Sequence, residues 1–339
     1  MILPVTESSQ VAEARRLSVA LARRLGFDET GLGKVALVVT EAATNLVKHA
    51  VHRGALLVRS LKIGRVGGIE ILALDTGPGI VNVGEALRDG YSTAGSPGTG
   101  LGAIGRLSTS FDIHSVPGVG TAVLAQLWSA PLPRKLLPRG LEIGVVNVPH
   151  PGEEVCGDGW AVDQCPGRSL ILLADGLGHG ILAAEAAVEA VKTFQNNTSL
   201  APAQVVAAIH AALRSTRGAA VAVAEVDAAQ QVVRFAGVGN IAGLILSADG
   251  CRHLVSHNGT AGHEVRKIQE FTYPWPARGG GRQPLLILHS DGLTSRWDLD
   301  RYPGLAQRHP SLIAGVLYRD FYRGRDDVTV VVATEKRVG

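Results

Sequence analysis

The sequence predicts a two-domain protein of the α/β class, with an α+β arrangement in which helices and strands are partly segregated. Three observations support this class. The first part of the chain has helix-like segments followed by strand-like runs, a proline-rich stretch interrupts the pattern at 129–140, and the second part has many short apolar runs. A chain of 339 residues is long enough for about two domains. We therefore expect a first domain over 1–130, a linker over 131–140 and a second domain over 141–339.

Two helices are expected at the start of the first domain. Apolar residues recur at three- and four-residue steps over Ser8–Leu25, and Asp28 can cap a second helix that continues to about His49. Strand-like runs follow at Leu56–Ile63, Ile69–Leu74, Phe111–Ser115 and Thr121–Trp128. This order predicts an α/β sandwich in which helices cover one face of a mixed sheet.

The second domain is expected to have a β-rich core flanked by helices. Its strand-like runs are Leu141–Val148, Trp160–Gln164, Ser169–Leu173, Ala219–Val226, Val232–Ala236, Leu285–His289 and Val328–Ala333. Helix-like patterns occupy Ile181–Phe194 and Ala203–Arg214.

Composition excludes several classes of function. The net charge is only +3, and there is no basic tail or Lys/Arg run with interleaved aromatics, so we expect no binding to nucleic acid. No apolar run approaches the ~18–20 residues of a membrane span, and the N-terminus does not resemble a signal peptide. Three cysteines without a CxxC pair suit a reducing compartment. We expect a cytoplasmic protein that does not bind membranes.

The helix predicted to end near His49 carries a first candidate site. Glu41 and Asn45 lie one turn apart, nearly opposite the apolar face that must be core. Glu41 could accept a proton from an incoming hydroxyl, and the amide oxygen of Asn45 suits Mg²⁺. The alternative is a solvated helix face without a catalytic role.

The motif DTGPGI (75–80) follows a strand-like run and carries a second part of this site. The Asp75 carboxylate, at a strand end, could accept a hydrogen bond from an exocyclic amine such as that of adenine. Gly77 and Gly79 would let the chain turn sharply beneath a flat ligand. An ordinary Gly-Pro turn is the alternative.

A glycine-rich loop, GTGLG (98–102), precedes a helix-like stretch. Main-chain N–H groups at a helix N-terminus suit phosphates, so Gly98, Gly100 and Gly102 are candidate phosphate-binding positions. Such loops are common, and this motif alone is a weak signal.

Together these motifs resemble the GHKL ATP-binding domain, and more closely its small serine-kinase branch, the RsbT/RsbW/SpoIIAB anti-sigma-factor kinases. The resemblance covers about residues 5–128 and includes GVGT (118–121), which is similar to the element that closes the nucleotide pocket. It implies a GHKL-type α/β sandwich that binds ATP and Mg²⁺, with Glu41 as general base and Asn45 as the Mg²⁺ ligand. The nucleotide-binding positions that it implies are Asn45, Asp75, Gly77, Gly79, Gly98, Thr99, Gly100, Leu101, Gly102 and Thr121.

Acidic motifs mark a second candidate site in the second domain. Asp158 lies in GDGW, Asp175 and Asp291 each follow an apolar run, and Asp326-Asp327 precede one. Carboxylates at the ends of core strands can converge, and their hard oxygens suit Mg²⁺ or Mn²⁺. Two such ions could clamp a phosphate and activate a water. The alternative, for each Asp-Gly taken alone, is a turn.

These motifs resemble the SpoIIE/RsbX branch of the PPM-type Ser/Thr phosphatases, over about residues 140–335, and imply an α-β-β-α sandwich with two Mg²⁺ or Mn²⁺. The metal ligands that the resemblance implies are Asp158, Asp175, the Gly176 carbonyl, Asp291 and Asp326, with Asp175 and Asp291 also catalytic. Asp327 is the alternative to Asp326.

Three further residues lie near these motifs in the sequence. His179 could assist a leaving group or be structural, and both readings stay open. Cys156 is interpreted as a small packing residue. Asn240, in GVGN (237–240), is placed near the site.

The two resemblances imply bacterial partner switching, in which a kinase phosphorylates a STAS-domain protein on Ser or Thr and a phosphatase reverses this. The first hypothesis is a bifunctional kinase and phosphatase. Because simultaneous action on one residue would only hydrolyse ATP, the two activities must then be reciprocally regulated or directed at different substrates. The second hypothesis is a phosphatase whose N-terminal domain is a non-catalytic nucleotide sensor or docking module. A sigma factor or a stressosome-like complex is a further candidate partner.

Overall fold

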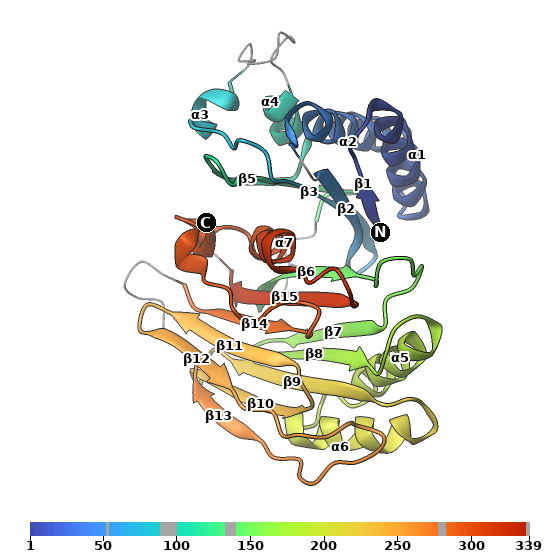
Figure 1. Ribbon diagram of the computed structural model, residues 1–339, viewed down its shortest axis with the longest axis vertical. Coiled ribbons are helices and arrows are strands. Elements are labelled where there is room, and N and C mark those ends of the chain that lie inside the picture. Colours follow the sequence, from blue (N-terminus) through green and yellow to red (C-terminus); the bar gives the residue numbers. More distant parts are fainter. Residues whose placement is uncertain (52–53, 89–99, 133–139, 277–282, 337–339) are drawn as a thin grey trace. The chain divides into compact units, whose positions relative to one another are not determined.

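The computed structural model describes residues 1–51, 54–88, 100–132, 140–276 and 283–336 (Figure 1). The chain divides into two compact units. Unit 1 comprises Met1–Leu137 and Leu299–Arg319, and unit 2 comprises Pro138–Asp298 and Asp320–Gly339. The first division falls inside the expected linker 131–140, of which residues 133–139 lie outside the described residues. The return of Leu299–Arg319 to unit 1 is a feature that the sequence did not predict.

Unit 1 contains a five-stranded sheet in the order β1-β2-β3-β5-β4. Its strands are β1 (Ile2–Pro4), β2 (Gly54–Ile63), β3 (Val66–Asp75), β4 (Ser110–Val116) and β5 (Gly120–Trp128). Every described pair in this sheet is antiparallel. The expectation of a mixed sheet was therefore wrong. Tight turns join β2 to β3 and β4 to β5, and neighbouring strands joined in this way must run in opposite directions.

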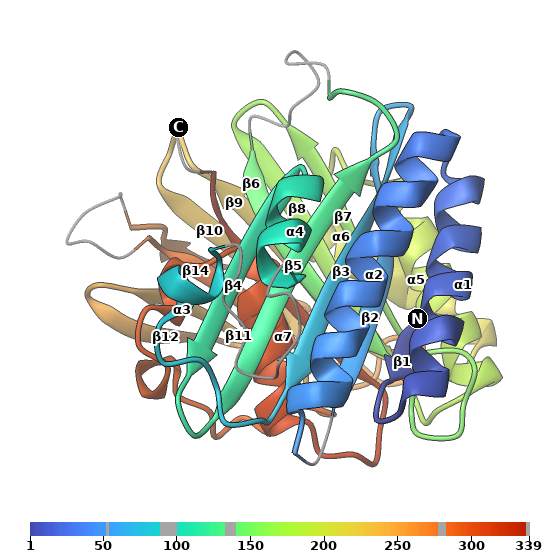
Figure 2. The same ribbon diagram turned by 90° about the horizontal axis from the view of Figure 1, so that it is seen from above.

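The predicted helices cover one face of this sheet (Figure 2). They are α1 (Ser8–Arg24), α2 (Glu29–His49) and α4 (Gly100–Leu107), and the short α3 (Val83–Ala86), which was not predicted, lies on the same side. The predicted cap is present, because Asp28 Oδ1 accepts the Gly31 N–H at 2.7 Å. Side chains alternate along β3, so Ile69, Ile71 and Ala73 join the core beneath the helices.

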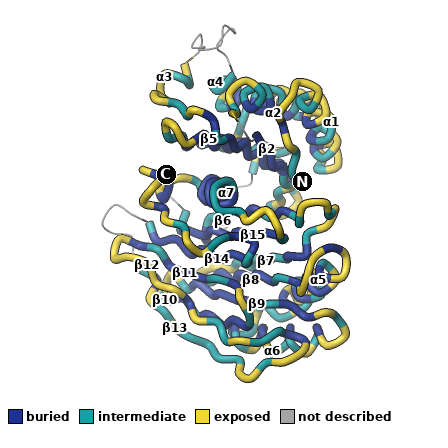
Figure 3. The backbone as a smooth tube through the Cα atoms, viewed as in Figure 1, coloured by how far each residue is buried: buried dark blue, intermediate teal, exposed yellow. Residues whose placement is uncertain are grey.

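The opposite face of the same sheet packs against α7 (Pro310–Phe321), a helix that the sequence did not predict. Leu72 and Leu74 of β3 point to this face, and a Cβ atom on Gly315 would lie only 2.7 Å from Leu72 Cδ2. Glycine therefore permits the close approach of α7. Residues 310–318 are all buried, which Figure 3 shows as a dark segment.

Unit 2 contains two five-stranded sheets, in the orders β13-β10-β9-β8-β7 and β12-β11-β14-β15-β6. Their strands are β6 (Leu141–Val148), β7 (Asp158–Cys165), β8 (Arg168–Gly176), β9 (Ala219–Asp227), β10 (Val232–Val238), β11 (Ala242–Ser247), β12 (Gly250–Leu254), β13 (Phe271–Pro274), β14 (Leu285–His289) and β15 (Val328–Glu335). Side chains of both sheets, such as Leu173, Phe235, Leu288 and Val331, share one core. The two sheets therefore pack face to face as a sandwich.

Helices α5 (Ile181–Gln195) and α6 (Pro202–Ala212) cover the outer face of the first of these sheets. Phe194 and Val206 pack there with Leu170 and Leu172 of β8. Both helices were predicted, whereas β11, β12 and β13 were not. The chain also forms short 3-10 turns at Leu213–Ser215, Leu299–Arg301 and Leu305–Gln307.

Within the described residues, no helix combines the length and apolar character that crossing a bilayer would require.

Candidate active sites in the two units

In unit 1 the structure brings Glu41 and Asn45 to the start of α4. A Cβ atom on Gly100 would lie 3.0 Å from Glu41 Oε2 and 3.6 Å from both Asn45 Oδ1 and Nδ2. Gly100 is the first residue of α4, where main-chain N–H groups have no partner within the helix. The carboxylate, the amide and a helix N-terminus thus meet at one place.

Asp75 ends β3 as a largely buried carboxylate. Its Oδ1 accepts the N–H groups of Gly77, at 2.7 Å, and Thr121, at 3.3 Å. Burial raises the pKa of Asp75 above its usual range, although these two donors oppose the shift. The two hydrogen bonds fix the carboxylate between the DTGPGI turn and the start of β5.

The glycines of the DTGPGI turn are required by close approach. A Cβ atom on Gly77 would lie 2.2 Å from the His49 carbonyl oxygen, and one on Gly79, at φ +71°, would lie 2.3 Å from the Val116 carbonyl oxygen. The turn is also bound to β4, because the Ile80 N–H donates to Ser115 Oγ at 2.8 Å. Ser115 Oγ lies 3.0 Å from Thr121 Oγ1. Thr121 thus lies in one hydrogen-bonded network with the turn.

Gly98 and Thr99 lie outside the described residues, whereas Gly100, Leu101 and Gly102 form the first turn of α4. The Leu101 side chain packs partly against the core of unit 1, so any contact with phosphate would come from its main chain. The described residues provide the types of chemical group that an ATP–Mg²⁺ complex requires. They provide an Asn oxygen for the cation, N–H groups for phosphates and an Asp acceptor for adenine.

In unit 2 strand pairing places two of the predicted carboxylates side by side. Asp158 opens β7 and lies opposite Asp175, near the end of β8. Asp158 Oδ2 accepts the Ser290 hydroxyl at 2.7 Å, whereas the buried Oδ1 has no hydrogen-bond partner. An unpartnered buried carboxylate oxygen is costly unless a further group satisfies it.

Both carboxyl groups have strongly shifted pKa values. Burial, with the nearby negative charges of Asp327 and Asp326, raises the pKa of Asp158 to about 7. Burial and the charge of Asp158, followed by that of Asp291, raise the pKa of Asp175 to about 9. Such mutual repulsion requires the acidic groups to lie close together.

The remaining predicted acids lie at the ends of β14 and β15. Asp291 follows β14 and accepts a hydrogen bond from Asn240 Nδ2 at 2.7 Å, which confirms the predicted position of Asn240. Asp175, Asp291 and Asp326 line one pocket of about 450 Å³. Four strands from the two sheets thus supply acids to one region of unit 2.

The donor set suits hard divalent cations. The unpartnered buried oxygens are Asp158 Oδ1 and Asp327 Oδ2, and carboxylate oxygens are preferred ligands of Mg²⁺ and Mn²⁺. Within the described parts of the chain, however, no three Asp, Glu, His or Cys side chains are close enough to enclose an ion as they stand. The acids converge without forming a closed cage.

Gly176 lies against α5, and only a glycine fits at this position. A Cβ atom there would lie 2.2 Å from the Ala183 carbonyl oxygen. The Gly176 N–H donates to the Gly157 carbonyl at 3.1 Å, which ties the end of β8 to the residue that precedes Asp158. Its role as a carbonyl ligand stays a prediction.

Asp326 and Asp327 have different surroundings. Asp326 faces the pocket with Asp175 and Asp291. Asp327 is buried, and its Oδ1 accepts the His150 N–H at 2.8 Å. The pocket position favours Asp326 as the ligand, and the choice stays a prediction.

His179 and Cys156 are held by other groups. His179 Nδ1 lies 2.8 Å from Glu153 Oε1, and its ring stacks on His150 with the centroids 4.2 Å apart. Cys156 Sγ contacts Asn147 Nδ2 and the Val148 carbonyl oxygen. Burial raises the pKa of the Cys156 thiol, which suits a packing residue.

Three residues of this region were missed from the sequence. Asn258 and Thr260 line the acidic pocket, and the buried Ser290 donates to Asp158. Ser290 precedes Asp291 in SDGL, so its neighbourhood gave a usable signal. Asn258 and Thr260 belong to no recognised motif, and nothing in the neighbouring sequence indicated that they would line the pocket.

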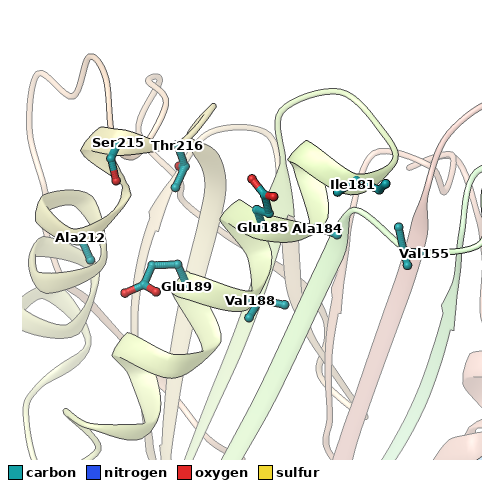
Figure 4. Close-up of a pocket in the computed structure, with 9 residues that line it drawn as sticks. All are labelled: Val155, Ile181, Ala184, Glu185, Val188, Glu189, Ala212, Ser215 and Thr216. Atoms are coloured by element: carbon teal, nitrogen blue, oxygen red, sulfur yellow. The ribbon is translucent and has the colours of Figure 1, made fainter.

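A second groove in unit 2 lies beside α5, between Val155 and the end of α6 (Figure 4). It is lined by Val155, Ile181, Ala184, Glu185, Val188, Glu189, Ala212, Ser215 and Thr216. None of the predicted acidic ligands lines it. We assign no chemistry to this groove.

Comparison with known proteins matches two parts of the chain to known families. Residues 4–127 match the family model of the histidine kinase-like ATPase domain, and residues 166–335 match that of stage II sporulation protein E. The serine/threonine-protein kinase RsbT of Bacillus subtilis (strain 168) is 32% identical over 118 residues, which are 35% of this chain and 88% of RsbT.

Two solved structures each resemble somewhat more than half of the chain. A chain from work on the bacterial stressosome is 29% identical with a TM-score of 0.52, over 57% of this chain and 98% of that one. RsbX in complex with magnesium is 20% identical with a TM-score of 0.50, over 58% of this chain and 96% of RsbX. The predicted pairing of a GHKL-type fold with a PPM-type phosphatase fold is confirmed.

Proposed function

Because the chain belongs to the family of stage II sporulation protein E and carries a histidine kinase-like ATPase domain before the matched region, we propose that it is a bifunctional partner-switching regulator. Unit 1 transfers the γ-phosphoryl group of ATP to a Ser or Thr of a STAS-domain protein. Unit 2 hydrolyses the resulting phosphate ester. The observation that carries the proposal is the convergence of acids in unit 2, with Asp158 opposite Asp175 and with Asp175, Asp291 and Asp326 around one pocket.

In the proposed hydrolysis, Asp158, Asp175, Asp291, Asp326 and the Gly176 carbonyl would hold two Mg²⁺ or Mn²⁺. When bound, these cations would supply charge neutralisation and an activated water. Hydrolysis forms a bond between a water oxygen and phosphorus and breaks the P–O bond to the side chain, and a water proton goes to the leaving oxygen, so that inorganic phosphate and a free hydroxyl result. Asn240 and Ser290 orient Asp291 and Asp158 through the hydrogen bonds described above.

In the proposed phosphorylation, Glu41 accepts the proton of the attacking hydroxyl. The hydroxyl oxygen bonds to the γ-phosphorus, and the bond to the β-phosphate oxygen breaks and releases ADP. Asn45 would hold Mg²⁺, and the N–H groups in the first turn of α4 would bind the phosphates. The proximity of Glu41 and Asn45 to Gly100 supports this assignment.

The phosphatase half is tested with Asp175→Asn. The full chain is incubated with a phosphorylated STAS-domain protein and Mn²⁺, and intact mass reports the phosphate. We expect at least a 100-fold slower loss of phosphate, because even outer partners of ligands cost about 10–100-fold. Asp163→Asn, on the same β7–β8 hairpin but away from the pocket, is the control. An Asp175→Asn protein as fast as wild type contradicts the assignment.

The kinase half is tested with Glu41→Ala, using unphosphorylated STAS-domain protein, ATP and Mg²⁺. Loss of the general base should slow phosphorylation by about 10²–10⁴-fold. Glu29→Ala, on the exposed first turn of the same helix, is the matched control. Phosphorylation at the wild-type rate in the Glu41→Ala protein would contradict the kinase assignment.

A second function, a phosphatase regulated by a non-catalytic nucleotide sensor, is favoured by the contact of Asp75 with the returning segment 299–319. In this case Glu41→Ala leaves nucleotide regulation intact, whereas Asp75→Asn abolishes it. Docking to a sigma factor or to a stressosome-like complex is tested by co-purification with the full chain.

A further inference from the structure

A segment between the two C-terminal acidic motifs belongs to the unit that carries the ATP motifs. Leu299–Arg319 lies in the sequence between SDGL (290–293) and RDDV (325–328), yet it groups with Met1–Leu137. Helix α7 of this segment packs on the sheet face opposite α1 and α2, where Gly315 contacts Leu72 and Leu74.

Polar contacts hold this segment along β3 and β4. The Asp112 carboxylate accepts the His309 N–H at 2.8 Å and Arg308 Nη1 at 3.2 Å. Ser311 Oγ donates to the buried Glu70 at 2.8 Å. The segment is therefore bound to the sheet by specific hydrogen bonds as well as by apolar packing.

The last residue of the segment reaches the adenine motif. Arg319 Nη1 donates to the Asp75 carbonyl oxygen at 3.0 Å. A Cβ atom on Gly120, at φ +139°, would lie 2.1 Å from this oxygen and 2.9 Å from Arg319 Nη1. Gly120 belongs to GVGT (118–121), and its neighbour Thr121 pairs with Asp75. The Arg319 guanidinium thus contacts the main chain of Asp75, the proposed adenine acceptor. Any side chain at position 120 would block this contact.

The residues that directly follow Arg319 form hydrogen bonds with the acidic motifs of unit 2. The Phe321 carbonyl accepts the Thr294 N–H at 3.0 Å, and the Arg323 N–H donates to the Gly292 carbonyl at 2.9 Å. The Tyr322 hydroxyl donates to the Asp326 carbonyl oxygen at 3.0 Å. A continuous stretch therefore runs from the Asp75 peptide to the main chain of both C-terminal metal motifs.

We infer that Arg319 is a positioning residue of the nucleotide site and that α7 couples nucleotide binding in unit 1 to phosphatase activity in unit 2. The inference rests on the proposed binding of ATP. A nucleotide that hydrogen-bonds to the Asp75 carboxylate acts on the strand end that Arg319 holds, and α7 transmits the change to the residues bound to SDGL and RDDV. Coupling of this kind is reciprocal between two binding sites.

The test uses the full chain with ADP and p-nitrophenyl phosphate, with Mn²⁺ in excess over nucleotide. In wild type, saturating ADP should change kcat/KM for p-nitrophenyl phosphate by about 5-fold or more. In Arg319→Met, the Kd for ADP should rise by about 5-fold, and ADP that saturates the variant should no longer change kcat/KM. Arg319→Lys keeps one donor and should restore part of both effects.

Arg308→Ala is the matched control, because it removes an arginine of the same segment that contacts Asp112 and not Asp75. Its ADP response should equal that of wild type. The inference is overturned if Arg319→Met binds ADP and responds to it as wild type does, or if ADP binds wild type without changing kcat/KM. Wild type that binds no ADP at all instead refutes the proposed ATP site. If Arg319→Met does not fold, Arg319→Lys with a wild-type response overturns the inference.

Discussion

Glu70 in unit 1 and Asp158 in unit 2 are almost equally buried, with exposed fractions of 3% and 5%, but they differ in their partners. Glu70 accepts hydrogen bonds from Arg59, Gln126 and Ser311 on both oxygens. Asp158 Oδ2 accepts the Ser290 hydroxyl, whereas its buried Oδ1 has no hydrogen-bond partner.

The pKa values of the two acids move in opposite directions. Burial alone would raise the pKa of Glu70, but the Arg59 charge and the hydrogen-bond donors hold it below its usual value. Burial and neighbouring acids raise the pKa of Asp158 to about 7. Burial therefore does not distinguish Glu70 from Asp158, a candidate metal ligand, whereas their hydrogen-bond partners and neighbouring charges do.

The largest effect on stability is expected from Glu70→Gln. Loss of the negative charge breaks the buried ion pair of Glu70 with Arg59, which should lower the free energy of unfolding by about 3 kcal/mol. Because the folded pKa of Glu70 lies below the unfolded value of about 4.3, this contribution is fully present above that pH and is lost as pH falls through the folded pKa. Urea unfolding of both proteins at pH 7 and in acid measures it.

Glu13→Gln is the control for Glu70→Gln, because Glu13 pairs with Arg16 on the exposed face of α1. It should change stability by less than about 0.5 kcal/mol. If both substitutions lowered the free energy of unfolding equally, Glu70 would not be a stabilising buried acid.

An intermediate effect is expected from Ser290→Ala, which removes the hydroxyl that donates to Asp158 Oδ2. Loss of this orienting hydrogen bond should lower phosphatase activity by about 10–100-fold, with a higher Mn²⁺ requirement. Titration of p-nitrophenyl phosphate hydrolysis with Mn²⁺ measures both. Ser247→Ala, at a buried serine of β11, should leave both unchanged. Full activity in Ser290→Ala would place Asp158 outside the functional set.

The smallest effect, and one of opposite sign, is expected from Asp158→Asn in EDTA. The folded pKa of Asp158 is raised, so its ionisation destabilises the fold as pH rises from the unfolded pKa through about 7. At pH 8 the substitution should stabilise the metal-free protein by about 1 kcal/mol. Thermal unfolding with and without Mn²⁺ measures this. A metal-free variant less stable than wild type would mean that Asp158 is a structural acid like Glu70.

The sequence predicted the acidic residues better than it predicted the segments that connect them. Asp175, Asp291 and Asp326 were recognisable because each lies next to an apolar run, and Asp158 because it lies in GDGW. Strand pairing brings Asp158 and Asp175 together. Apolar runs do not reveal in which direction a strand runs. The expectation of a mixed sheet in unit 1 therefore had no support from the pattern, and it was wrong. The short, largely exposed β12 gave too little pattern to recognise.

Helix α7 could not be found by periodicity, because residues 310–318 are buried on every side and leave no polar stripe. Its contact with the ATP motif was equally hidden, because Arg319 and Asp75 are separated by 244 positions in the chain. Ser290 was missed for another reason. It lies in the SDGL motif, but its hydroxyl donates to Asp158, 132 positions away, and only the fold shows this pairing.

The return of Leu299–Arg319 to the first unit also bears on how such a protein could evolve. A gene broken after Leu137 would yield an ATPase half without the helix that packs on Leu72 and Leu74, and a phosphatase half carrying that helix without its sheet. Exposed apolar surface of this kind favours aggregation. Once two ancestral domains had joined in this way, a break at this point would leave both products with exposed apolar surface, so the two domains would be inherited, synthesised and degraded together.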